Sequence, residues 1–118
     1  MKPFPEPHDL IAFFEVEPRV LDPGVPWAYN HLEFEVTRGA DRINCVIEPG
    51  YGVLRVRWSR SADELAFLDF NTVRGLNLEE SPTGQVLTAT FDESSELTSV
   101  RIRLRPQVQV FCHTEPRP

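Results

Sequence analysis

The chain has 118 residues, of which 41% are hydrophobic and 25% charged, and its formal net charge is −6. This length fits one domain with a single hydrophobic core, and the composition excludes an intrinsically disordered chain. The negative charge argues against a nucleic-acid partner, because phosphate groups attract Lys and Arg. No apolar stretch approaches the roughly 20 residues needed to cross a bilayer, so we expect no membrane partner.

Both ends of the chain are rich in proline. We therefore expect a single domain over residues 1–118, with residues 1–8 and 114–118 as flexible tails. Pro and Glu occupy the first residues, where a secretion signal would have an apolar run, so we expect a cytoplasmic protein. Cys45 and Cys112 form no short metal or redox motif, and we predict two buried free thiols in a reducing compartment.

The first element in chain order, residues 9–14, fits two structures. Asp9 is a suitable cap for a short helix that places Leu10, Phe13 and Phe14 on one side. The same residues also suit a strand that continues to Val16. The local pattern leaves both alternatives open.

Residues 32–58 alternate between apolar and polar side chains with the period of two that is typical of β-strands. The apolar positions are Leu32, Phe34, Val36, Ile43, Cys45, Ile47, Leu54, Val56 and Trp58. Four-residue turns at 38–41 and 49–52 place Val36 opposite Ile43 and Ile43 opposite Trp58, with every apolar position on one face. A slip of one residue would invert every side chain, so this agreement predicts an antiparallel three-stranded meander.

The next segment is ambiguous. Residues 61–64 resemble a helix capping box, Ser-Ala-Asp-Glu. Residues 65–70 are rich in Leu and Phe, and a helix there would have to end by residues 74–75, Arg-Gly. We favour a strand over 65–70 and keep the helix as the alternative.

A second meander follows the same logic. A four-residue loop at 81–84 places Leu78 opposite Leu87 and Leu76 opposite Ala89. Apolar and polar residues alternate again over 100–104, and the apolar residues stay at even-numbered positions beyond Pro106. Because proline cannot donate a hydrogen bond within a sheet, either one strand bends there or two strands are joined there. We predict a mainly all-β fold of antiparallel meanders, a sandwich or rolled half-barrel of about seven to nine strands, with one possible N-terminal helix.

No set of residues predicts catalysis, a metal or a cofactor. The three histidines, His8, His31 and His113, lack metal-ligand spacing. Cys112 and His113 are neighbours, which on a strand point to opposite faces and cannot form a Cys–His pair. We therefore predict that the chain is not an enzyme.

Acidic residues dominate the segment 63–96, where Arg74 is the one base. The acids are Asp63, Glu64, Asp69, Glu79, Glu80, Asp92, Glu93 and Glu96. They form either a solvated surface or an acidic face that docks a basic protein partner. The candidate partner-binding residues are these eight acids and Trp27, whose alternative role is to cap the end of the core.

Arginines form the opposite pattern on the predicted outward faces. Arg101, Arg103 and Arg105 share one face, and Arg55 and Arg57 share another. They suit an anion-binding strip. They also suit a set of cross-strand ion pairs with the acids, which is the interpretation we favour.

As a class, the chain resembles the small β-rich immunity proteins that bacteria encode beside polymorphic or contact-dependent toxins. The resemblance is carried by the single β-rich domain, the lack of an export signal, the acidity, and Trp27, Tyr29 and Asn30 before a strand meander. It implies tight binding to a toxin domain, commonly with a basic cleft, and neutralisation by occlusion. It assigns no role to any residue and leaves the oligomeric state open.

Two other functions compete with this one. A β-sandwich module for a small molecule or carbohydrate would have a concave pocket lined by aromatics such as Trp27, Tyr29 or Tyr51. An enzyme, the third possibility, would need convergent polar residues with perturbed pKa values in a cleft.

Overall fold

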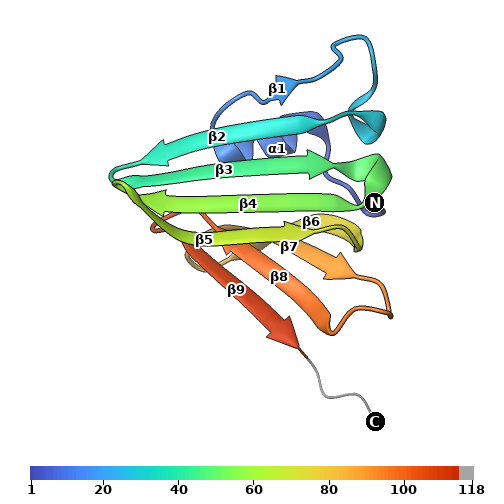
Figure 1. Ribbon diagram of the computed structural model, residues 1–118. Coiled ribbons are helices and arrows are strands. Elements are labelled where there is room, and N and C mark those ends of the chain that lie inside the picture. The colour runs from blue at the N-terminus through green and yellow to red at the C-terminus, as the bar shows by residue number, and fades with distance from the viewer. Residues whose placement is uncertain (115–118) are drawn as a thin grey trace. The chain divides into compact units, whose positions relative to one another are not determined.

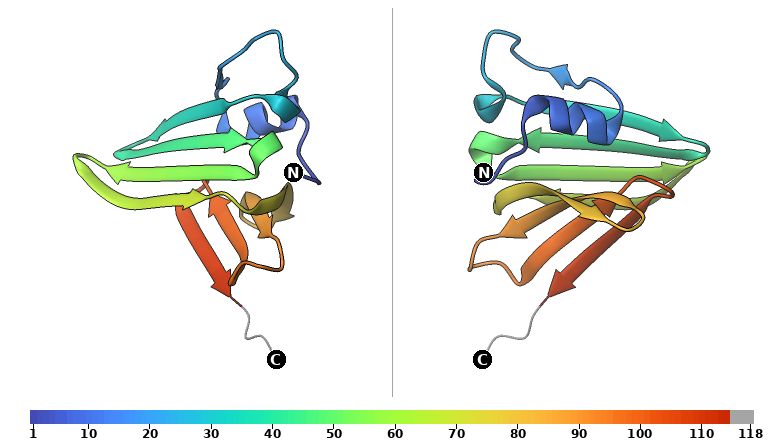
Figure 2. Two further views of the ribbon diagram at one scale, coloured as in Figure 1. Left: turned by 45° about the vertical axis from the view of Figure 1, so that its right-hand side comes forward. Right: turned by 180° about the vertical axis from the view of Figure 1, so that it is seen from behind.

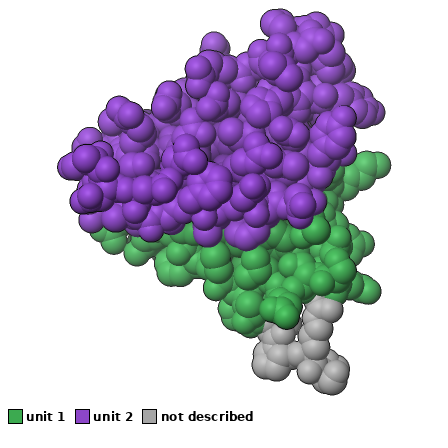
Figure 3. Space-filling view, in the orientation of Figure 1, with its two compact units in different colours: residues 1–5, 72–118 green, residues 6–71 purple. Residues whose placement is uncertain are grey.

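The computed structural model describes residues 1–114 and shows a mainly β chain of nine strands and one α-helix (Figure 1). The strands form two antiparallel sheets of five and four strands, and neither sheet closes into a barrel within the described residues. The predicted antiparallel β fold is thus confirmed. The chain divides into two compact units, residues 6–71 and residues 1–5 with 72–118 (Figure 3). We call the first the helix unit, after its α-helix. We call the second the arginine unit, after the run Arg101, Arg103 and Arg105.

The sheet of the helix unit follows the chain in the order β1-β2-β3-β4-β5. Its strands are β1 (Arg19–Val20), β2 (Leu32–Arg38), β3 (Asp41–Glu48), β4 (Val53–Arg60) and β5 (Asp63–Phe70). Val36 pairs with Ile43, and Ile43 pairs with Trp58, so the predicted register is confirmed. The segment 65–70 is a strand, as we favoured, because its alternate side chains Ala66 and Leu68 continue the inner face opposite Trp58 and Val56.

The ambiguous segment 9–14 lies in helix α1 (Pro7–Phe14). The helix begins after Glu6 with Pro7 in its first turn, so Asp9 lies inside the helix and is not its cap. Its apolar side is buried, and the Phe14 ring stacks on Phe34 of β2 with centroids 4.2 Å apart. The helix therefore covers the inner face of this sheet, as the view from behind in Figure 2 shows.

The sheet of the arginine unit has the order β6-β7-β8-β9. Its strands are β6 (Val73–Ser81), β7 (Gly84–Phe91), β8 (Leu97–Arg103) and β9 (Gln109–Thr114). Leu78 pairs with Leu87, and Leu76 with Ala89, as the sequence predicts. The chain turns near Pro106 and begins a new strand there, which is the second of the two alternatives for this segment.

The N-terminal residues run alongside β6. The Lys2 amide donates to the Arg74 carbonyl at 2.8 Å, and the Leu76 amide donates to the Pro3 carbonyl at 2.9 Å. Gly75 permits this approach, because a Cβ there would lie 2.7 Å from the Lys2 carbonyl oxygen. The predicted C-terminal tail lies outside the described residues, except for Thr114, which ends β9. No helix among residues 1–114 has the length and apolarity to span a membrane.

The two cysteines differ in their surroundings. Cys45 is buried, but Cys112 is exposed, so the prediction of two buried thiols is wrong for Cys112. The reason is that β9 is the last strand of its sheet and has a neighbour on one side only. Burial raises the pKa of the Cys45 thiol to about 12, which keeps it protonated at neutral pH.

We expect iodoacetamide at neutral pH to alkylate Cys112 and to spare Cys45 in the folded protein, because only the thiolate reacts. Peptide mass spectrometry after timed quenching measures both sites. The Cys112→Ser variant should show almost no labelling until denaturant is added. Comparable labelling of Cys45 and Cys112 in the native state would contradict this assignment.

Candidate functional site

The eight acids of residues 63–96 are divided between the two units. Asp63, Glu64 and Asp69 belong to β5 of the helix unit. The other five, Glu79, Glu80, Asp92, Glu93 and Glu96, belong to the arginine unit. The acid-rich segment of residues 63–96 therefore contributes acids to both units.

Several of these acids are paired with arginines on other strands of the same sheet. Arg57 Nε lies 2.9 Å from Glu64 Oε1, and Arg55 Nε lies 3.1 Å from Asp69 Oδ1. In the arginine unit, Arg101 Nη2 lies 3.8 Å from Glu79 Oε2. Cross-strand pairing thus accounts for part of both the acidic run and the arginine pattern, and it lowers the charge that these acids offer to a partner.

Asp92 has a local structural role. Its carboxylate accepts hydrogen bonds from the Ser94 amide and the Ser94 hydroxyl, which shapes the loop between β7 and β8. These bonds, led by the one from the hydroxyl, lower the pKa of the Asp92 carboxyl.

Net charge is unevenly distributed between the units. The helix unit carries twelve Asp and Glu against six Arg, whereas the arginine unit carries six acids against six bases. The entire formal charge of −6 therefore belongs to residues 6–71. The long-range electrostatic field of this unit is therefore negative.

The helix unit has a hollow of about 240 Å³ beside two short 3₁₀ turns, η1 (Trp27–Tyr29) and η2 (Pro49–Tyr51). Its lining consists of Leu21, Tyr29, Asn30, His31, Glu48 and Tyr51, and we call it the tyrosine hollow. Leu21, Tyr29 and Tyr51 are 78%, 76% and 78% exposed, the highest values among the large exposed hydrophobic side chains of the described residues. Such exposure of large side chains around one concavity is typical of a binding surface.

Backbone packing between the turns places the two tyrosines. A Cβ on Gly50 would lie 3.4 Å from the Ala28 carbonyl oxygen and 3.9 Å from the Tyr29 Cα. These are ordinary van der Waals distances, so η2 packs closely against the backbone of η1 at this position. Gly52, with φ of 66°, then ends η2 in the left-handed region that glycine adopts without strain.

Asn30 fixes the loop that carries Leu21 and Tyr29. Its Nδ2 donates to the carbonyls of Asp22 at 2.6 Å and Val25 at 3.0 Å. Its Oδ1 accepts from the amides of Asp22 at 3.2 Å and His31 at 2.8 Å. One buried amide side chain thus satisfies four backbone groups of a loop that has little regular structure.

A histidine–carboxylate pair completes the lining of the tyrosine hollow. His31 Nδ1 lies 2.8 Å from Glu48 Oε1, and the two side chains are 32% and 23% exposed. His31 immediately precedes β2 and Glu48 ends β3, and the neighbouring Leu32–Ile47 pair aligns the two residues across the strands. The hollow therefore combines exposed aromatic rings with a half-buried carboxylate.

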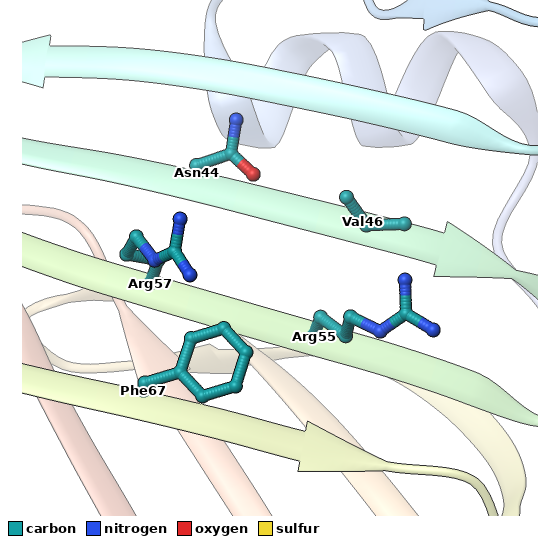
Figure 4. A pocket seen from close by; sticks show the side chains of 5 residues that line it. All are labelled: Asn44, Val46, Arg55, Arg57 and Phe67. Carbon is teal, nitrogen blue, oxygen red and sulfur yellow. The ribbon is translucent and has the colours of Figure 1, made fainter.

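A second hollow, of about 380 Å³, lies on the outer face of the same sheet (Figure 4). Its lining comprises Asn44, Val46, Arg55, Arg57 and Phe67. The Arg57 guanidinium lies over the Phe67 ring, 4.7 Å from its centroid, and its Nε is paired with Glu64. This surface is mixed in charge, and its arginines are already engaged within the sheet.

The packing of Trp27 fits its alternative role as a cap of the core. It is half-buried, and the edge of its ring packs on Phe34 with centroids 6.2 Å apart. Tyr29, two residues later, is the exposed aromatic of this segment. Sequence reasoning missed Leu21, His31 and Glu48 as parts of a site, since they come from three separate strand ends and share no motif.

The described residues contain no group of three or more His, Cys, Asp or Glu side chains arranged to hold a metal ion.

Comparison with known proteins bears on the fold. The sequence matches no protein-family model. It matches no curated protein. The structure is similar to a chain of a contact-dependent growth inhibition toxin–immunity protein complex from Klebsiella pneumoniae 342. The TM-score is 0.81 with 16% sequence identity, over 95% of this chain and 96% of that chain.

The two proteins share a fold over essentially their whole lengths. The class-level resemblance to immunity proteins, which the sequence indicated, is therefore confirmed for the fold.

We expect Asn30→Ala to lower the free energy of unfolding by about 1–3 kcal/mol, because it removes four part-buried hydrogen bonds that hold this loop. Urea denaturation measures the change. The matched control is Asn71→Ala, at an exposed turn position, which should stay within about 0.5 kcal/mol of the wild type. Equal effects of the two substitutions would show that Asn30 does not hold the loop.

Proposed function

We propose that this chain is an immunity protein, a non-catalytic binder that neutralises a bacterial toxin by occluding it. The observation that supports the proposal most is the TM-score of 0.81 over nearly the whole of both chains with a member of a toxin–immunity complex. The similarity covers nearly all of both chains, so it concerns the whole fold and not one shared motif. This favours a function that depends on the whole fold.

The distribution of charge supports a basic partner. A charge of −6 on residues 6–71 attracts a positively charged protein and raises the rate of encounter. The cytoplasm is the compartment of this proposal, because the free thiols Cys45 and Cys112 are typical of a reducing environment.

A small-molecule or carbohydrate-binding module is the second candidate, because Tyr29 and Tyr51 do line a common hollow. We rank it lower because the hollow, at about 240 Å³, is smaller than the roughly 300–1,000 Å³ of common ligand pockets.

Co-expression with the product of the neighbouring gene tests the immunity proposal. We expect the untagged chain to co-purify with the tagged neighbour and to restore growth of cells in which that neighbour is toxic. A neighbour with an inactivated active site should still co-purify, because occlusion does not require catalysis. Failure of both co-purification and rescue would refute the proposal.

Matched charge reversals test which unit steers the partner. One variant changes four acids of the arginine unit to Lys: Glu79, Glu80, Asp92 and Glu93. The other changes four exposed acids of the helix unit to Lys: Asp9, Glu17, Glu35 and Asp63. Both variants change the total charge by the same amount. A difference between their association rates therefore shows which unit's acids attract the partner.

We expect the helix-unit variant to lower the association rate by about tenfold or more at low salt, and the arginine-unit variant to lower it less. Stopped-flow kinetics at several salt concentrations measures both rates. A larger loss in the arginine-unit variant would instead identify the acids of residues 79–93 as the docking face.

A further inference from the structure

We infer that the tyrosine hollow is a socket for one arginine side chain of the protein partner. The guanidinium group would lie against the rings of Tyr29 and Tyr51 and pair with the Glu48 carboxylate. This inference rests on the proposed function and adds to it the contact surface and the chemistry of the group that the surface recognises.

Two exposed aromatic rings line the hollow. Tyr29 and Tyr51 are each more than three-quarters exposed, whereas Phe67 and Phe111 are about half exposed. A tyrosine ring offers a large rigid contact area and a negative π face, which suits a cation. Arginine is the cation most often found in such contacts, because its planar group also stacks on rings.

Glu48 supplies a carboxylate to the same hollow. Its side chain is 23% exposed and belongs to the lining of the hollow, with Oε1 held by His31 at 2.8 Å. A carboxylate has two oxygens and about four acceptor sites, so Glu48 can receive a guanidinium N–H while it keeps the bond to His31. Partial burial strengthens this interaction relative to one in open water.

Charge complementarity points to the same ligand. The hollow lies in the unit that carries the whole formal charge of −6. An acidic side chain of a partner would meet the Glu48 carboxylate, and an apolar one would bury that carboxylate without a new bond. A basic side chain satisfies both the carboxylate and the rings.

The socket is also held in position before binding. Asn30 bonds four backbone groups of the loop that bears Leu21 and Tyr29, and η2 packs against η1 beside Gly50. Contacts that need little ordering on binding retain more of their interaction energy as affinity.

A small probe tests the socket without any toxin. The full chain is titrated with Nα-acetyl-arginine N-methylamide, and the ring protons of Tyr29 and Tyr51 are followed by NMR. The matched control is the citrulline analogue, which has nearly the same shape without the charge. We expect the arginine probe to shift both rings, the citrulline probe to shift them much less, and Glu48→Gln to remove most of the difference. Absent ring shifts, or equal shifts with both probes, would overturn the inference.

Alanine substitutions test the socket in the complex with the neighbouring gene product. We expect Tyr29→Ala and Tyr51→Ala each to raise the Kd by about tenfold or more, as loss of a buried interface anchor does. Tyr51→Phe, which keeps the ring, should change it much less. Phe67→Ala and Phe111→Ala, at exposed aromatics outside the hollow, should leave it within about twofold.

The outcomes separate the two proposals. A wild-type chain that binds the neighbour as tightly as its Tyr29→Ala and Tyr51→Ala variants would overturn the socket and leave the immunity function standing. A wild-type chain that binds no neighbour would count against the immunity function, and the arginine probe would still decide whether the hollow accepts a guanidinium.

Discussion

The helix unit is organised around the packing of aromatic rings on Phe34. Phe14 stacks on one side of this ring, at 4.2 Å between centroids, and the edge of Trp27 meets it at 6.2 Å. The first contact holds α1 against the inner face of the sheet, and the second anchors η1 at the end of the same core. The loop that exposes Tyr29 therefore depends on a buried residue of β2, since Trp27 and Tyr29 share one short turn.

The surface of this unit combines two kinds of charged group. Arg55, Arg57, Glu64 and Asp69 are paired across β4 and β5, and exposed pairs of this kind contribute little net charge or stability. The excess of six acids over residues 6–71 remains after such pairing and gives the unit its field. In the proposed function, specific contact and long-range attraction have separate sources: the first is the aromatic surface of the tyrosine hollow, and the second is the unbalanced charge.

Immunity by occlusion requires a rigid surface that is complementary to one partner. The sheet of the helix unit is rigid because its strands pair in one register. Tyr29 and Tyr51 are exposed where this sheet ends, in η1 and η2. Asn30 is a structural residue in this arrangement, while Tyr29, Tyr51 and Glu48 are the groups available for contact. The difference matters for mutagenesis, because we expect loss of Asn30 to act through stability and, under the proposed function, loss of a tyrosine to act through affinity.

The sequence by itself determined the strands and their pairing within each meander. Alternation has a period of two, and short turns allow one register that keeps apolar residues together, so Phe34 had to face Cys45 and Leu78 had to face Leu87. It left the segment 9–14 open, because a short apolar run suits both helix and strand until its packing partner, Phe34, is known.

Only the tertiary structure decided where the candidate site lies. Leu21, Tyr29, His31, Glu48 and Tyr51 are separated along the chain and meet because β1, β2 and β3 end beside η1 and η2. The acidic run of residues 63–96 looked like one surface in the sequence, yet the fold divides it between two sheets and pairs part of it with arginine. Side-chain exposure and charge balance are properties of the folded chain, so no local pattern could reveal them.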